Sequence, residues 1–447
     1  MSSTTNTVSR PSSLATLRTC WARSDALFDL VGRERWLTQG IVLRHPFLFY
    51  VGHLAAFAWN QLSAALGEGP YHREFDRLFE LGIDPEDERQ ARTLAPPRWP
   101  PVDEVLAYRD GVREALARFV PQIEARAKED RVIRDLMPLL IEHELMHQET
   151  LLYMIQQLEP TTLVRPPHWC EALAGPAASA NRPVTLPAGE VRLGAELGEI
   201  PFGWDNEFPS EVLAVPGFTL DSLPVTIGDY QRFVQAGAYG EECWWESGDR
   251  AWLAGDRREL PVNWRRTASG DLEVRSLFEW YPLAAVSGWP VYVSHAEARA
   301  YCRWVGARLP SEAELHRAAF TSPEGAQRPF PWGEAAVDAG HGTLNFARAG
   351  RTPVGSHPEG RSAWGVDELV GNGWEWTSTP FLARPGFEAI HPHYPTYSAN
   401  FFDGRHFVVF GASWATDARL VRRSFRNWFQ RRYPYVFAKF RTVAVSR

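Results

Sequence analysis

The residues best suited to chemistry in this 447-residue chain are histidines inside two apolar segments. His143 and His147 lie between Arg131 and Leu158, where apolar periodicity and the lack of glycine predict a helix. Residues four apart share one face of a helix, so these two imidazoles can bind one ion. His53 lies in a second apolar run, 45–66, where an imidazole without a partner would be costly. Together they predict a metal site, although His53 taken alone also fits a hydrogen-bonded core histidine.

The histidine pair also matches a peptidase pattern. Residues 143–147 read His-Glu-Leu-Met-His, which fits H-E-x-x-H with Glu144 as the general base beside Zn(II). The metzincin form continues with glycine and a third histidine, whereas Gln-Glu-Thr follows here at 148–150. A zinc metallopeptidase is therefore a remote alternative.

Composition narrows the class of protein. The formal net charge of −7 argues against a nucleic-acid or anionic-membrane partner. The four cysteines are scattered without C-x-x-C spacing, and the polar N-terminal segment has no apolar signal region, so we expect a cytoplasmic protein. Polar His53, Asn60 and Gln61 interrupt the 45–66 run, which we interpret as a buried helix of a soluble protein.

The first part of the chain predicts a helical bundle. Its four long helices are expected at Ser13–Val31, His45–Leu66, Val102–Lys128 and Arg131–Leu158. A bundle of this kind can hold a metal ion between facing helices. The connection 71–101 is rich in proline and charge and is expected to be irregular. Its length suggests a functional role.

The character of the chain changes after a linker at residues 160–183. From Val184 onward, short strands, turns, glycine and tryptophan dominate, with one clear helix at Ser294–Val305 that Ser294 and Glu297 cap. We therefore expect an α+β protein of two domains, at residues 13–170 and 184–447.

Four motifs in the second half occur in a familiar order: Pro201–Pro209 (PFGWDNEFP), Leu223–Thr226 (LPVT), Gly306–Glu314 (GARLPSEAE) and Gly371–Thr377 (GNGWEWT). They resemble the formylglycine-generating-enzyme-type (sulfatase-modifying-factor) domain, which has a C-type-lectin-like fold. The first half resembles a DinB-like four-helix bundle, whose metal histidines match His53, His143 and His147. This arrangement is similar to that of the ergothioneine-type sulfoxide synthases (EgtB) and the selenoneine synthases (SenA).

The resemblance implies a non-haem iron oxidoreductase. A single Fe(II) would be held by the three histidines, with its remaining positions open to O2 and substrate, and imidazole ligands suit this ion. Glu149 would then orient a ligand histidine from outside. A triad of two histidines and Glu149 is the alternative ligand set.

Members of this family bind hercynine, the N-alpha-trimethyl form of histidine, and bond sulfur or selenium to its imidazole carbon. The segment 424–428 matches their substrate-binding segment, so Asn427 is expected to bind the carboxylate and Trp428 the quaternary ammonium. In the tyrosine-bearing segment 393–402, Tyr394 is the first candidate for the catalytic residue and Tyr397 the second. Core packing for Trp428, and structural roles for both tyrosines, are the alternatives.

The donor of the sulfur or selenium is less clearly indicated. Phe429 stands where ergothioneine synthases often have aspartate, and Met146 where many have glutamine, which disfavours a gamma-glutamylcysteine donor. The segments 79–85 and 433–437 resemble the selenoneine synthases, which use a selenosugar. Arg89 and Arg92, in the long connection, are candidates for binding an anionic group of the donor. The alternative is that they belong to a solvated loop.

Three other functions fit less well. Formylglycine generation relies on a late cysteine pair, and no cysteine follows Cys302. A DinB-type thiol transferase would leave the complete second domain unexplained, and a binding module would leave the histidines unexplained. No feature of the sequence indicates the oligomeric state.

Overall fold

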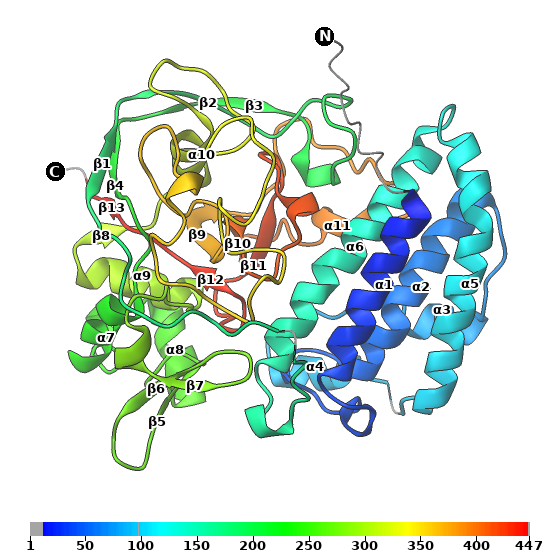
Figure 1. Cartoon of the computed structure of the whole chain (residues 1–447), viewed down its shortest axis with the longest axis horizontal. Coiled ribbons are helices and arrows are strands. Elements are labelled where there is room, and N and C mark those ends of the chain that lie inside the picture. Colours follow the sequence, from blue (N-terminus) through cyan, green and yellow to red (C-terminus); the bar gives the residue numbers. More distant parts are fainter. Residues whose placement is uncertain (1–11, 97, 168, 446–447) are drawn as a thin grey trace, which may run out of the picture. The chain divides into compact units, whose positions relative to one another are not determined.

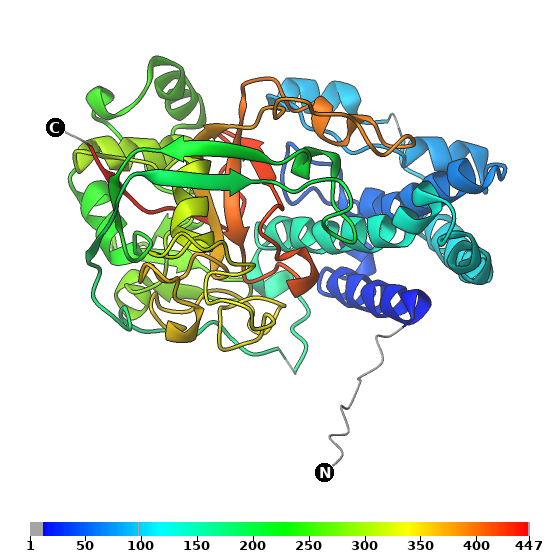
Figure 2. The same cartoon turned by 90° about the horizontal axis from the view of Figure 1, so that it is seen from above.

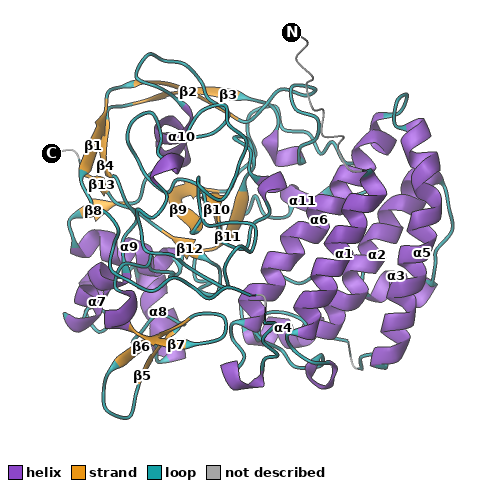
Figure 3. Ribbon diagram, viewed as in Figure 1, coloured by secondary structure: helices purple, strands orange, loops and turns teal. Residues whose placement is uncertain are grey.

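The computed structural model describes residues 12–96, 98–167 and 169–445. The chain divides into two compact units, which meet in sequence between Leu151 and Leu152. Helices make up the first unit, whereas strands, short helices and long loops make up the second (Figures 1 and 3). The expected α+β organisation is confirmed.

Four long helices in the described residues form the first unit, as the apolar periodicity predicts. They are α1 (Ser13–Asp29), α2 (Phe47–Leu66), α5 (Val102–Arg126) and α6 (Arg131–Ile155). α2 packs along α5, and the four helices lie side by side (Figures 1 and 2).

Helix α2 is the centre of this bundle. Every residue from Phe47 to Trp59 is buried, and a helix that is apolar on all sides must be covered on all sides. It ends at Gly67, whose φ of +76° lies in the left-handed region that favours glycine at a helix end. No helix in the described part of the chain has the length and hydropathy of a membrane span.

The expectation of an irregular connection at 71–101 is partly wrong. Two short helices form within it, α3 (Arg73–Leu78) and α4 (Glu88–Leu94). Side chains cap both: His72 accepts a hydrogen bond from the backbone of Phe75, and Asp87 accepts one from Gln90. Helices of two turns are too short to show apolar periodicity, so the caps were the available signal.

The second unit contains four sheets within the described residues. One has the order β1 (Pro183–Leu186), β4 (Phe218–Asp221), β13 (Val443–Ala444), β8 (Ala307–Arg308). Another has the order β11 (Asn427–Gln430), β10 (His406–Ala412), β9 (Gly373–Pro380), β12 (Ala438–Lys439). The smaller sheets are β2 (Gly189–Leu193) with β3 (Glu211–Val215), and β5 (Trp264–Arg266), β6 (Leu272–Arg275), β7 (Trp280–Pro282). In the second sheet, β11 is an edge strand paired antiparallel to β10, which aligns Trp428 with Val408.

Five helices accompany these sheets: α7 (Ile227–Gln235), α8 (Ser247–Asp256), α9 (His295–Trp304), α10 (Glu312–Phe320) and α11 (Thr396–Ala399). The predicted helix at Ser294–Val305 is confirmed as α9, and Ser294 and Glu297 form its capping box. The sequence analysis did not predict α7 and α10, although capping boxes also begin them, at Thr226 and Ser311. Both helices have only nine residues, so their periodicity is weak.

The last turn of α6 belongs to the second unit. Gln156 donates a hydrogen bond to the backbone oxygen of Arg275 at 3.0 Å. Tyr153 packs edge-on against the rings of Phe429, Tyr433 and Phe437. These contacts place the division between the units inside a helix, ahead of the linker at 160–183.

Candidate active site

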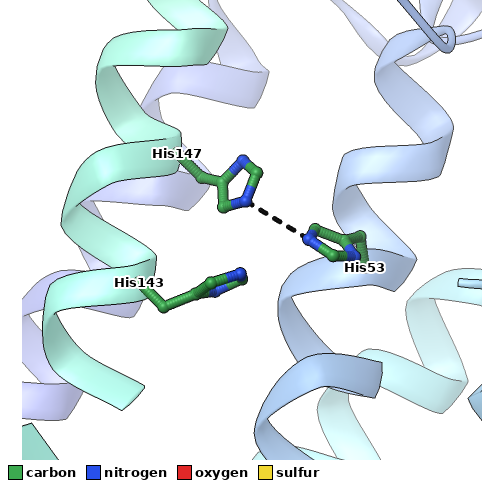
Figure 4. A group of neighbouring side chains, drawn as sticks. All are labelled: His53, His143 and His147. Carbon is green, nitrogen blue, oxygen red and sulfur yellow. Dashed lines mark hydrogen bonds between the residues drawn. The ribbon is translucent and has the colours of Figure 1, made fainter. Parts of the chain in front are cut away.

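The three predicted histidines come together inside the first unit (Figure 4). His53 extends from α2, and His143 and His147 extend from α6 one turn apart. Their candidate ligand nitrogens all lie within 4.8 Å of one another, and the Nε2 atoms of His53 and His147 are 3.2 Å apart. An ion about 2.0–2.1 Å from each imidazole places neighbouring nitrogens roughly 3 Å apart. The cluster therefore fits one ion.

Burial keeps these imidazoles neutral. It lowers the pKa of His53 to about 4, against the opposing effect of a backbone hydrogen bond. Burial, followed by the charge of the neighbouring imidazoles, holds the pKa values of His143 and His147 well below 6.5. Metal ions bind the neutral form of histidine, so this set is ready to bind a metal at neutral pH.

A backbone carbonyl orients the His53 ring. Nδ1 of His53 donates a hydrogen bond to the oxygen of Phe79 at 2.7 Å, which leaves the Nε2 lone pair for a metal. Gly52 permits this contact, since a Cβ there would lie 2.6 Å from the ring of Phe79. Neither residue was predicted from the sequence to support the site. A glycine inside an otherwise apolar helix was the available signal, because glycine weakens a helix unless packing requires it.

Aromatic rings hold the planes of two histidines. Phe57 stacks on His143 with ring centroids 3.4 Å apart and planes 6° apart. Phe49 stacks on His53 at 5.1 Å and 17°. This packing fixes the imidazole rotamers and surrounds the cluster with apolar surface.

The glutamate of the H-E-x-x-H pattern points to a different partner. Ser24 on α1 donates a hydrogen bond to the Glu144 carboxylate at 2.5 Å, and burial raises the pKa of that carboxyl group. Gln148 donates to Ser24 and to the backbone of Cys20, which ties the same face of α6 to α1. Glu144 is therefore engaged away from the histidines, which argues against a role as a peptidase base.

Glu149 is buried on α6 but is not part of the histidine cluster. A helix turns about 200° over two residues, so Glu149 leaves α6 on the side opposite His147. The hydrogen bond that orients His53 is accepted by the backbone oxygen of Phe79 instead. A role for Glu149 around the metal stays a prediction.

An aromatic group surrounds Trp428 in the second unit. The Trp428 ring stacks on Phe381 with centroids 4.0 Å apart and planes 7° apart. Tyr397 meets it at 75° and 5.4 Å, and Phe401 at 49° and 5.4 Å. Asn427 accepts a hydrogen bond from the backbone N–H of Trp428 through Oδ1. Aromatic faces that meet at a corner are the geometry that attracts a cation.

The two candidate tyrosines lie next to this group. Tyr397 is buried and stacks on Trp204 at 4.0 Å, and the ring of half-buried Tyr394 lies 5.5 Å from it. Burial, followed by the charge of Asp205, raises the pKa of Tyr394 to about 12. Its hydroxyl therefore keeps its proton at neutral pH. The sequence analysis did not assign Trp204, although it lies in a quoted motif.

The remaining predicted residues are more dispersed. Met146 is half-buried on α6, and the ring of Phe429 on β11 stacks on Tyr433 with planes 8° apart. Arg89 and Arg92 are exposed on α4, where Arg92 pairs with Glu88 at 3.3 Å. Their roles toward a substrate stay predictions.

Comparison with known proteins gives this architecture a family. Residues 16–151 match the model of the DinB superfamily, and residues 171–445 match that of the Sulfatase-modifying factor enzyme 1-like domain. The chain is 34% identical over 367 residues to Hercynine oxygenase of Mycolicibacterium smegmatis, which is 79% of this chain and 80% of that protein. The chain belongs to the hercynine oxygenase family. The DinB-like and formylglycine-generating-enzyme-like domains expected from the motifs are thereby confirmed.

Two other members of the family show how far the similarity extends. Hercynine oxygenase of Mycobacterium tuberculosis is 37% identical over 245 residues, 53% of this chain and 54% of that protein. Ergothioneine biosynthesis protein 1 of Neurospora crassa is 30% identical over 507 residues. That match takes in 95% of this chain but 56% of the fungal protein, so the chain spans little more than half of that relative's length.

Proposed function

We propose that this protein uses Fe(II) and O2 to bond sulfur or selenium to the imidazole carbon of hercynine. The observation that carries the proposal is a cluster of three neutral imidazoles, two buried and one half-buried, in a chain one-third identical to a hercynine oxygenase. Three imidazoles suit Fe(II) and leave the ion's other positions open. When bound, the iron would supply O2 activation.

The overall reaction balances with O2 as the sole oxidant. The imidazole C–H bond and the donor S–H or Se–H bond break, and a carbon–sulfur or carbon–selenium bond forms. One oxygen atom ends on the sulfur or selenium, and the other leaves as water with the two released hydrogens. Formation of the carbon–sulfur or carbon–selenium bond releases two electrons, and oxidation of the sulfur or selenium releases two more. These four electrons reduce O2.

The chain's own residues hold the reactive groups in this proposal. Phe79 and Phe57 fix the imidazoles of His53 and His143, so the metal would not depend on flexible side chains. Phe49 and Phe57 cover the faces of the His53 and His143 rings with apolar surface. Pre-set ligands of this kind reduce the reorganisation that reaction would otherwise require.

Hercynine carries a trimethylammonium and a carboxylate, and the group around Trp428 offers a partner for each. The corner between Trp428 and Tyr397 would take the cation without a counter-charge. Asn427 uses Oδ1 for the backbone, which leaves its Nδ2 to donate to the carboxylate. Tyr394 would hold the proton that the reaction consumes or releases.

For the donor, we propose a selenosugar. The selenoxide first formed would then lose the sugar by elimination: the selenium–sugar bond and a neighbouring sugar C–H bond break, the sugar leaves with a carbon–carbon double bond, and its hydrogen moves to the oxygen on selenium. Phe429 and Met146 offer no hydrogen bond to a charged peptide, which disfavours gamma-glutamylcysteine. Cysteine or gamma-glutamylcysteine as the donor, with a hercynine sulfoxide as the product, is the alternative.

Anaerobic reconstitution with Fe(II) tests both the proposed reaction and the proposed donor. Hercynine, air and one donor are added per tube (selenoglucose, cysteine or gamma-glutamylcysteine), and the products are identified by mass spectrometry. A selenium product from selenoglucose alone supports the selenosugar, and a sulfoxide moves the donor to a thiol. No product from any donor contradicts the proposal.

A further inference from the structure

The first unit contains a cavity of about 800 Å³ apart from the histidine cluster. It opens between the start of α2 and the connection that carries α3 and α4, and none of His53, His143 and His147 lines it. Its volume lies in the range of small-molecule sites. Its walls combine charged, apolar and aromatic side chains, among them His45, Arg73, Glu74, Arg77, Leu81 and Trp99.

The charged part of the wall favours an anion. Arg73 and Arg77 occur one turn apart on α3, and both are exposed. Neither forms an ion pair with another described residue, whereas Glu74 adds one negative charge beside them, so the rim is net positive. Unpaired guanidinium groups offer the forked donors that carboxylates and phosphates accept.

The deeper wall has an unsatisfied polar group. His45 is 5% exposed, and its Nδ1 has no hydrogen-bond partner within the described part of the chain. Its ring contacts Phe49 and the edge of Trp99, so an apolar surface surrounds it. A buried imidazole nitrogen without a partner is costly, and such groups mark places where a ligand supplies the missing bond.

We infer that this cavity binds a small organic anion, a molecule with one carboxylate or phosphate on an apolar or ring-shaped body. The anion is held by Arg73 and Arg77. The apolar or ring-shaped body of the ligand lies against Leu81 and Trp99, and a polar atom of the ligand forms a hydrogen bond with His45. Leu81 is 56% exposed and lines the cavity, so its side chain is accessible to the body of a ligand.

The test is calorimetric titration of the full-length, metal-free chain, so that the result is independent of hercynine chemistry. The probes are phenylacetate and phenyl phosphate, with phenylacetamide as the neutral match. We expect saturable binding of at least one anion below about 10 mM, and binding of phenylacetamide on the order of tenfold weaker or more. The stronger of the two anions identifies the carboxylate or phosphate class.

Variants locate the site. The double variant Arg73→Gln/Arg77→Gln is expected to weaken anion binding on the order of tenfold, and Leu81→Glu to weaken it through repulsion. Arg118→Gln on α5 is the matched control, an exposed arginine that does not line the cavity, and should bind as the wild type does. Absence of saturable binding overturns the inference, and so does binding that the three cavity substitutions leave unchanged. All of these positions are exposed, and circular dichroism verifies that each variant is folded.

Discussion

The two candidate sites of this protein are built in opposite ways. The histidine cluster stands on two long helices, where a spacing of four residues and one helix contact bring the ligands together. The aromatic group around Trp428 gathers an edge strand, the short helix α11 with Tyr397, and loop segments with Trp204 and Phe381. The first depends on helical periodicity and the second on the complete fold of its unit.

The difference also concerns what holds each side chain. In the cluster, a hydrogen bond that His53 donates to a backbone carbonyl fixes its imidazole, and close ring stacking fixes that of His143. Around Trp428, the contacts are mainly ring to ring. Loss of one metal ligand should therefore eliminate function, whereas loss of one aromatic contact should weaken it by degrees.

The largest effect is expected from the cluster. His143→Ala removes one of three ligands and should eliminate both iron retention and turnover, and the same holds for His53→Ala and His147→Ala. Iron per chain is measured by plasma mass spectrometry after desalting. His341→Ala, a histidine of the second unit, is the control and should keep its iron. Wild-type turnover in any of the three ligand variants would refute the three-histidine assignment.

Tyr394→Phe tests the candidate catalytic tyrosine beside the aromatic group around Trp428. If Tyr394 handles a proton in the reaction, kcat should fall by about 10²-fold or more while the KM for hercynine changes little. Tyr397→Phe keeps its stacking on Trp204 and should lose far less. The reverse ranking in steady-state kinetics would assign the proton to Tyr397.

Gly52→Ala tests whether Phe79, which lies outside the histidine cluster, orients the His53 imidazole. The added methyl group would meet the Phe79 ring, displace its carbonyl from His53 and lower iron affinity by about 10–100-fold. Gly69→Ala is the matched control, since a Cβ there meets no atom within 4 Å. Competition with a chelator of known affinity gives both values, and equal affinities would remove Phe79 from this role.

Trp428→Ala should raise the KM for hercynine by roughly tenfold, because a cation–π contact contributes about 1–2 kcal/mol. Trp428→Phe keeps an aromatic face and should lose less. Histidine, which lacks the trimethylammonium, serves as the comparison substrate and should respond weakly to either change. An unchanged KM in Trp428→Ala would leave core packing as the role of this residue.

Glu144→Gln should have the smallest effect. The amide can still accept the hydrogen bond from Ser24, so iron content and hercynine turnover should stay close to those of the wild type. Casein cleavage by the wild type, lost in this variant, would instead support the peptidase alternative.

Much of this organisation was predictable from the sequence. The four long helices follow from apolar periodicity, because each buries a continuous face. His143 and His147 follow from spacing within one helix, and the capped helix α9 follows from local hydrogen bonds that Ser294 and Glu297 make. All of these are properties of neighbouring residues, which the order of the chain specifies directly.

Only the tertiary structure decided the rest. The Phe79 carbonyl at the His53 ring and the contact of Glu144 with Ser24 each join distant segments. So do the partners of Trp428, which come from a loop and from a helix of four residues, both too irregular or short to show periodicity. Spacing along one helix is determined by its pitch, but a contact between distant segments is determined by how a whole unit packs.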